Sequence, residues 1–192
     1  MEAFEHVVNV YLQTLGYAVT TNVKFPVRQR TRRRDRAEYQ THGYEVDIVG
    51  ARGGELLLGE AKSYFGSRGL VRDHFVGLGG SSETARALQR RMKIFNDSEI
   101  RDQVLEQAKE TYGYPISKIR LGLFVGKFGG GHEEDIRRHL EGLRVGGGPV
   151  RIVGIQDISR QLISAIESST YVDDPVIVTL RLMKAAGYLQ GA

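Results

Sequence analysis

The chain has 192 residues, of which 41% are hydrophobic, and this is enough apolar material for one domain with a sizeable core. It contains no cysteine, which excludes disulfides, thiolate metal sites and cysteine nucleophiles. The formal net charge of +4 is less informative than the location of the positive charges along the chain. No stretch approaches the roughly 20 apolar residues of a membrane span, and the acidic start of the chain differs from a signal peptide. We therefore expect a single cytoplasmic domain over residues 1–192 that contacts no membrane.

The first third of the chain predicts one helix followed by three strands. Apolar residues at helical spacing indicate a helix over 3–15, ended by Gly16. The alternating segment after it predicts a strand that ends at Pro26. Two further strand-like runs, at 44–49 and 55–62, flank a glycine-rich turn and predict a β-hairpin.

The rest of the chain alternates helices and strands. Residues 64–95 have a weak pattern and are interpreted as an insertion or flap. The further elements expected in order are a helix over 98–112, a strand over 119–125, a helix over 132–143, a strand over 150–155, a helix over 158–168 with Asp157 as its N-cap, and a helix over 175–188. Consecutive early strands and later crossovers predict an α/β fold with a mixed central β-sheet flanked by helices.

A dense arginine cluster lies between residues 28 and 36 and is expected to be a basic loop. Its members are Arg28, Arg30, Arg32, Arg33, Arg34 and Arg36, against one aspartate. Arginine pairs with phosphate in a fixed bidentate geometry, so the cluster indicates a nucleic-acid-binding site and DNA as partner. The alternative interpretation is a solvated, mobile loop.

The residues that indicate catalysis are Asp47, Glu60 and Lys62. Side chains alternate along a strand, so Glu60 and Lys62 share one face while Ala61 points away. If Asp47 lies on the neighbouring strand of the hairpin, its carboxylate reaches the same face. Carboxylates are hard ligands suited to Mg²⁺, and an ammonium beside them can orient a metal-bound water and stabilise charge on phosphorus.

The ordinary alternative is an exposed acid–lysine pair on a strand surface. The sequence context argues against it, because three leucines run directly into Gly59 and Glu60. Asp47 likewise lies within an apolar run, where a carboxylate needs a partner.

The pattern of Asp47, a spacer of twelve residues and Glu60-Ala61-Lys62 resembles the signature of the PD-(D/E)XK nuclease superfamily. The resemblance extends in element order over roughly residues 1–125. It implies a restriction-endonuclease-like fold. It also implies that Asp47, Glu60 and the backbone carbonyl of Ala61 bind the metal, and that Lys62 positions the attacking water.

A further acidic residue, Glu5 on the first expected helix, resembles the one that many members of this superfamily use to help hold metal. Two features depart from the pattern: Val46 replaces proline, and the Gln-x-x-x-Tyr spacing of some subfamilies is missed by Gln103 and Gln107.

Together these features predict a metal-dependent DNA endonuclease that hydrolyses phosphodiester bonds, of restriction, junction-resolving or repair type. The expected cofactor is Mg²⁺, with Mn²⁺ able to substitute. The alternative is a catalytically silent nucleic-acid-binding module of the same fold; a protein-assembly module would leave the arginine cluster unexplained. Cutting both strands of a duplex needs two active sites or two visits, so we expect a homodimer, with 175–188 as the first candidate surface.

Overall fold

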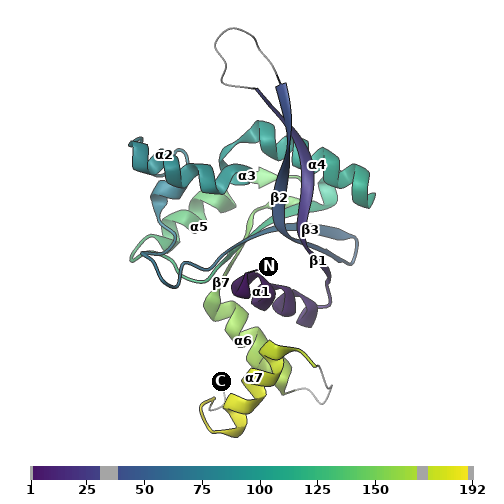
Figure 1. Ribbon diagram of the computed structural model, residues 1–192, viewed down its shortest axis with the longest axis vertical. Coiled ribbons are helices and arrows are strands. Elements are labelled where there is room, and N and C mark those ends of the chain that lie inside the picture. Colours follow the sequence, from purple (N-terminus) through teal and green to yellow (C-terminus); the bar gives the residue numbers. More distant parts are fainter. Residues whose placement is uncertain (1, 31–38, 168–172, 190–192) are drawn as a thin grey trace.

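A computed structural model describes residues 2–30, 39–167 and 173–189 of the chain. The fold is α/β, with a five-stranded mixed sheet flanked by helices on both faces (Figure 1). This architecture confirms the coarser expectation from the sequence, an α/β fold with a mixed central sheet flanked by helices. Within the described ranges, no helix is long and apolar enough to cross a membrane.

The helices of the described residues are α1 (Ala3–Thr14), α2 (Glu83–Gln89), α3 (Lys93–Asn96), α4 (Ser98–Tyr112), α5 (Glu133–Glu141), α6 (Ile155–Ile166) and α7 (Pro175–Ala185). The strands of the main sheet are β1 (Ala18–Arg30), β2 (Tyr39–Arg52), β3 (Glu55–Lys62), β4 (Ile119–Val125) and β7 (Arg151–Gly154). A short hairpin consists of β5 (Arg144–Val145) and β6 (Gly148–Pro149), and single 3₁₀ turns are η1 (Arg72–His74), η2 (Arg90–Met92) and η3 (Ile116–Lys118).

The sheet has the order β1-β2-β3-β4-β7. Its first three strands pair antiparallel, and β4 and β7 join parallel to β3 through crossover connections. The turn between β2 and β3 uses Gly53 and Gly54, whose φ angles of 55° and 82° lie in the left-handed region that glycine adopts without strain. The hairpin and the crossovers that the sequence predicts are therefore both present.

The predicted end of the first strand at Pro26 is wrong. Strand β1 continues to Arg30, with Pro26 opposite Gly43 in the ladder. Proline is tolerated because β1 is the edge strand of the sheet, where a missing N–H leaves no neighbouring strand without its hydrogen bond. As a consequence Arg28 and Arg30 lie on a strand and not in the expected loop, while residues 31–36 of that loop lie outside the described ranges.

A second boundary also differs from the prediction. Helix α6 begins at Ile155 with Gly154 as its N-cap, so Asp157 lies within the first turn and is not the cap. An acidic side chain in the first turn still interacts favourably with the helix dipole. The hairpin of β5 and β6 was not expected, because strands of two residues are too short to produce a pattern.

Two apolar clusters cover the two faces of the sheet. One face packs against α4, α5 and the segment before α4, and the other against α1, α6 and α7. The segment 64–95, expected as an insertion or flap, contributes buried Leu70, Phe75, Met92 and Phe95 to the first cluster. Much of this segment is thus part of the core.

The hairpin of β1 and β2 extends well beyond the rest of the sheet, and α6 and α7 lie at the opposite end of the molecule (Figure 1). Pairing between β1 and β2 reaches Arg30 and Tyr39, whereas β2 pairs with β3 only from Ile48 onward. The outer part of this hairpin is therefore a two-stranded arm, and the point where it leaves the sheet is next to Asp47.

Candidate active site

The sheet opens at Asp47. The ladder between β2 and β3 ends with the pair Ile48 and Gly59, so the last residues of β3 are paired with β4 alone. In place of a ladder bond, the backbone N–H of Ala61 donates a hydrogen bond to Asp47 Oδ2 at 2.8 Å. A side chain from β2 thus takes over the role of strand pairing and fixes the position of the end of β3.

This opening results from a change of face along β2. On a regular strand Val46 and Ile48 would share a face, but Val46 belongs to the cluster that contains α4 and Ile48 to the cluster that contains α1. On β1 the ladder to β2 skips Asn22, between the pairs Thr21–Ile48 and Val23–Val46, and its φ of 56° lies in the left-handed region that asparagine tolerates. The local distortion of both strands allows Asp47 to turn toward β3.

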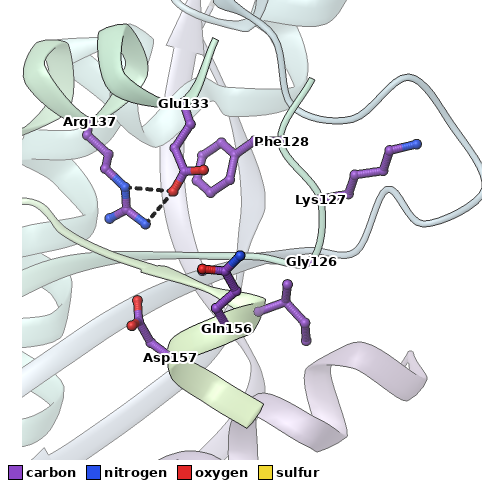
Figure 2. A pocket seen from close by; sticks show the side chains of 9 residues that line it. Gly126, Lys127, Phe128, Glu133, Arg137, Gln156 and Asp157 are labelled. Carbon is purple, nitrogen blue, oxygen red and sulfur yellow. Dashed lines mark hydrogen bonds and ion pairs between the residues drawn. The ribbon is translucent and has the colours of Figure 1, made fainter. Parts of the chain in front are cut away.

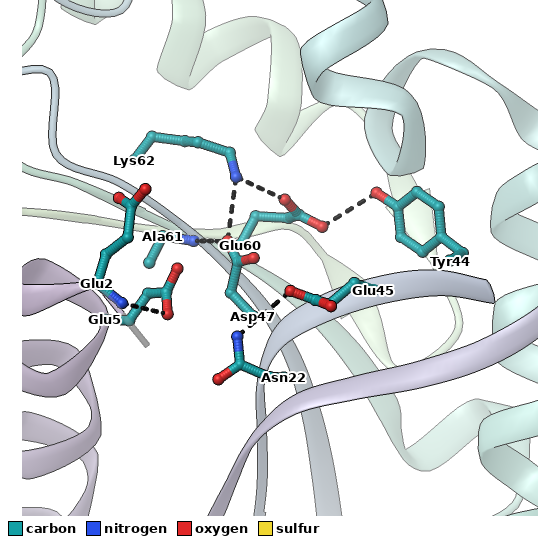
Figure 3. A network of polar contacts seen from close by, with 9 residues as sticks. All are labelled: Glu2, Glu5, Asn22, Tyr44, Glu45, Asp47, Glu60, Ala61 and Lys62. Carbon is teal, nitrogen blue, oxygen red and sulfur yellow. Dashed lines mark hydrogen bonds and ion pairs between the residues drawn. The ribbon is translucent and has the colours of Figure 1, made fainter.

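Three charged side chains meet at this opening (Figure 3). The Lys62 ammonium lies 2.9 Å from Glu60 Oε2 and 3.0 Å from Asp47 Oδ2. Tyr44 donates a hydrogen bond from its hydroxyl to Glu60 Oε1 at 3.0 Å. Glu60 is only 4% exposed. Its neighbour Ala61 points to the other face of the sheet and packs in the cluster that contains α1, as strand alternation predicts.

The electrostatics of this cluster are dominated by burial. Burial raises the pKa of Glu60 to about 7; Asp47 adds to the increase and Lys62 opposes it. For Lys62, burial acts to lower the pKa, but the two carboxylates outweigh it and the net direction is upward. Burial and the nearby Glu60 also raise the pKa of the Tyr44 phenol. One lysine therefore does not fully compensate the buried Glu60 and the half-buried Asp47.

The donor atoms at the opening fit a hard divalent cation. In a strand the N–H and C=O of one residue point to the same side, and the N–H of Ala61 faces Asp47, so its carbonyl faces the opening as well. Two carboxylates and one carbonyl are the oxygen donors that Mg²⁺ accepts, with water in its other positions. Across the described part of the chain, no group of three or more acidic or histidine side chains could hold a metal ion by itself.

Glu5 also borders the site. It is a buried residue of α1 and lines the same open cleft, of about 430 Å³, as Asp47 and Lys62. Its carboxylate accepts a hydrogen bond from the backbone N–H of Glu2 at 2.9 Å and so caps the start of α1 (Figure 3). The structure brings Glu5 to the cleft without a direct contact to Asp47 or Glu60.

Of the arginine cluster, the described members are Arg28 and Arg30, which are exposed on the arm. The Arg28 guanidinium lies over the ring of Tyr39, 5.4 Å from its centroid. The side-chain amide of Gln103 on α4 accepts a hydrogen bond from the backbone N–H of Arg28 at 2.7 Å and donates one to the backbone carbonyl of Arg28 at 3.1 Å. These two hydrogen bonds connect the edge strand to α4. Four further members, Arg32, Arg33, Arg34 and Arg36, lie outside the described residues.

Sequence reasoning missed Tyr44, Tyr64 and Arg91. Tyr44 and Asp47 would lie on opposite faces of a regular strand, so only the change of face along β2 brings both to Glu60. Tyr64 and Arg91 line the cleft from the segment whose pattern was weak. A run of basic residues from 86 to 93 was visible in the sequence, but nothing in it distinguished Arg91 from its neighbours.

A separate pocket of about 240 Å³ lies at the carboxyl ends of β4 and β7 (Figure 2). Its charged groups already have partners: Arg137 pairs with Glu133 at 2.8 Å, and the Lys127 ammonium donates to the Ser67 carbonyl at 2.7 Å. Because these charges are satisfied, the pocket is a weaker candidate for chemistry than the opening at Asp47.

Comparison with known proteins adds little to this geometry. No family model matches the chain, and no curated protein matches it. One solved structure with some similarity is the crystal structure of AF1548, a protein of unknown function, at 15% sequence identity and a TM-score of 0.38 over 95% of this chain and 76% of that chain. A likeness of this size supports no argument, so the functional case rests on the site.

Proposed function

We propose that this protein is a metal-dependent DNA endonuclease with a restriction-endonuclease-like fold, related to the PD-(D/E)XK superfamily. The observation that carries the proposal is the convergence of Asp47, Glu60 and Lys62 where β2 and β3 separate, with the Lys62 ammonium within 3.0 Å of both carboxylates. An antiparallel hairpin followed by parallel strands, with the acid-x-lysine pair at the end of β3, agrees with the arrangement that the sequence resemblance implies.

The residues at the opening have distinct roles in this proposal. Asp47, Glu60 and the Ala61 carbonyl would hold Mg²⁺, with Glu5 as an additional acid at the border of the cleft. When bound, Mg²⁺ would supply positive charge at the scissile phosphate and a lower pKa for a bound water. Lys62 stays protonated beside the carboxylates, so it can donate hydrogen bonds to a water or to a phosphate oxygen.

DNA is proposed as the substrate because of the charge on the arm. Arg28 and Arg30 are exposed there and belong to a segment with four more arginines. Exposed arginines of this kind bind the phosphate backbone of DNA and do not distinguish one base sequence from another. Sequence specificity is therefore not part of the proposal.

The alternative is a catalytically silent nucleic-acid-binding module. One observation favours it: the Lys62 ammonium already contacts both carboxylates, and this contact compensates part of their charge without a metal. Such a module would bind DNA equally well with and without divalent ions.

The test is a cleavage assay on linear and supercoiled duplex, a four-way junction, single-stranded DNA and RNA, each with Mg²⁺, with Mn²⁺ and with a chelator. The proposal expects cutting of at least one DNA substrate that requires the metal. If all substrates stay intact while DNA is bound tightly, the binding module is the better account.

A homodimer is part of the proposal, through α7. This helix packs mainly against α6 and leaves Leu182 and Met183 exposed, Leu182 at 65%. Exposed apolar side chains on one helix are a typical subunit contact. Sedimentation equilibrium of the wild type and of Leu182→Glu tests this, and an unchanged monomer in both would contradict it.

A further inference from the structure

A second, smaller pocket adjoins the catalytic cleft. Its volume is about 270 Å³, and it shares Tyr64 and Arg91 with the cleft that contains Lys62. Its other lining residues include Ser67, Arg68 and His74, and none of the residues that line it is acidic. The catalytic cleft is lined by four acidic residues, whereas the pocket beside it is basic.

The positive charges that line this pocket belong to Arg68 and Arg91. In the described part of the chain, neither Arg68 nor Arg91 forms an ion pair with a carboxylate, although many other arginines do. The net effect on the buried His74 is a lowered pKa: burial lowers it most, the hydrogen bond with the Val71 backbone and the charge of Asp73 oppose this, and the charges of Arg91 and Arg68 add to the lowering. His74 is therefore neutral near pH 7, and the positive charge of the pocket comes from the arginines.

The walls of the pocket are fixed in place. The imidazole of His74 lies 3.1 Å from the Tyr64 hydroxyl on one side and 3.0 Å from the Val71 carbonyl oxygen on the other. Leu70 exchanges backbone hydrogen bonds with the segment after β4, at 2.9 and 2.7 Å. Gly69 has a φ of 95° and no room for a Cβ, since one would lie 2.6 Å from the backbone of that segment. A rigid binding site loses little entropy when it takes a ligand.

We propose that this pocket binds a backbone phosphate of the DNA substrate, next to the phosphate that is cut. The inference rests on the proposed function. Arg91 faces both cavities and Arg68 faces the basic one, so two guanidinium groups can grip a phosphate beside the Lys62 cleft. This subsite would hold the strand in register so that the scissile phosphate meets Lys62 and the carboxylates.

The first test uses inorganic phosphate and requires no cleavage. Titration of the metal-free protein is followed through the amide resonances of Ser67, Gly69 and Val71, with chloride at equal ionic strength as reference. We expect shifts that saturate in the wild type, are lost in Arg68→Ala and Arg91→Ala, and persist in Arg90→Ala. Arg90 is the matched control, because it precedes Arg91 in η2, is exposed and lines neither cavity.

The second test measures the affinity for a short DNA duplex in the presence of a chelator. Arg91→Ala and Arg68→Ala should each weaken binding about tenfold and reduce the slope of log affinity against log salt by about one, whereas Arg90→Ala should change affinity less than about twofold. Arg91→Lys should recover part of the loss, because it keeps the charge but not the bidentate geometry.

The outcomes separate this inference from the proposed function. Binding losses in Arg68→Ala and Arg91→Ala without any metal-dependent cutting by the wild type would support the subsite and reject the nuclease. If the wild type cuts DNA with metal, but Arg68→Ala and Arg91→Ala bind DNA as well as Arg90→Ala does, the subsite is overturned and the nuclease is retained. Shifts with inorganic phosphate but unchanged DNA affinity would assign the pocket to a free anion and overturn the inference.

Discussion

Asp47 and Ala61 are joined by a hydrogen bond of 2.8 Å at a position where the pairing between β2 and β3 has already ended. The carboxylate therefore has two partners of different kinds, a backbone N–H and the Lys62 ammonium 3.0 Å away. The first holds the end of β3 in place, and the second belongs to the charged cluster. Substitutions at Asp47 can separate these two roles.

Asp47→Asn should retain the fold and lose the metal. The asparagine side-chain oxygen can still accept the Ala61 N–H, but the negative charge that attracts a divalent cation is gone. We expect Mg²⁺ or Mn²⁺ affinity, measured by calorimetry, to fall by about 100-fold or more and cleavage to fall with it. Asp102→Asn, an exposed change on α4, is the control. Unchanged metal binding in Asp47→Asn would remove this residue from the metal site.

The burial of Glu60 predicts a pH dependence of stability. Its folded-state pKa of about 7 lies above the 4.5 of a free glutamate, so the folded state binds the proton more tightly than the unfolded chain. Its contribution to the free energy of unfolding is fully present below about pH 4.5 and is lost as pH rises through about 7, a change on the order of 1–3 kcal/mol.

This dependence is checked by chemical denaturation of the metal-free protein between pH 5 and pH 8. In Glu60→Gln, which cannot titrate, the decrease should be absent. Mg²⁺ should stabilise the wild type more at pH 8 than at pH 5.5, because at the lower pH it competes with a proton for Glu60. Identical pH profiles for the two proteins would show that Glu60 is ionised throughout.

Tyr44 should act through Glu60. Its hydroxyl donates to the carboxylate at 3.0 Å and stabilises the ionised form, so Tyr44→Phe should raise the pKa of Glu60 further. We expect the pH at which Mg²⁺ binding is half-maximal to move upward, with a loss of about 1 kcal/mol in the free energy of unfolding at pH 8. Tyr112→Phe, which removes the hydroxyl of a tyrosine that packs against the core cluster containing α4, serves as the comparison. A lower unfolding free energy without a shift in the pH of binding would indicate a merely structural tyrosine.

The arm should contribute to DNA affinity and not to chemistry. Replacing both Arg28 and Arg30 with alanine should reduce the salt dependence of DNA binding by about two in slope, with single-turnover cleavage of saturated enzyme unchanged. Arg160→Ala, at an exposed arginine of α6 that pairs with Asp157, is the control for removing an arginine charge away from the arm. A double variant whose salt dependence equals that of Arg160→Ala would show that the described arm does not contact DNA.

The sequence was sufficient for the overall architecture because the hydrophobic pattern is strong. The five strands of the main sheet and the helices α1, α4, α5, α6 and α7 were predicted, whereas α2, α3, β5 and β6 were not. Glu60 and Lys62 share a face because alternation along β3 is regular. The glycine-rich turn identified the hairpin, and thereby the neighbourhood of Asp47 and Glu60.

Prediction failed where tertiary structure overrides local pattern. Strand β1 passes through Pro26 because its outer edge has no neighbouring strand. Tyr44 reaches Glu60 only because β2 changes face beside Asp47. Arg91 borders the cleft because the irregular segment after β3 folds back over the sheet, and such a path leaves no periodic signal.

Lys62 and the two carboxylates are proposed to form a catalytic site. The most direct test compares Mg²⁺-dependent DNA cleavage by the wild type, Lys62→Ala and Lys109→Ala, an exposed lysine change on α4, with DNA affinity and folding measured in parallel. We predict that Lys62→Ala cuts at least about 100-fold more slowly while binding DNA and folding normally, and that Lys109→Ala behaves as the wild type. Cleavage by Lys62→Ala at the wild-type rate would contradict it.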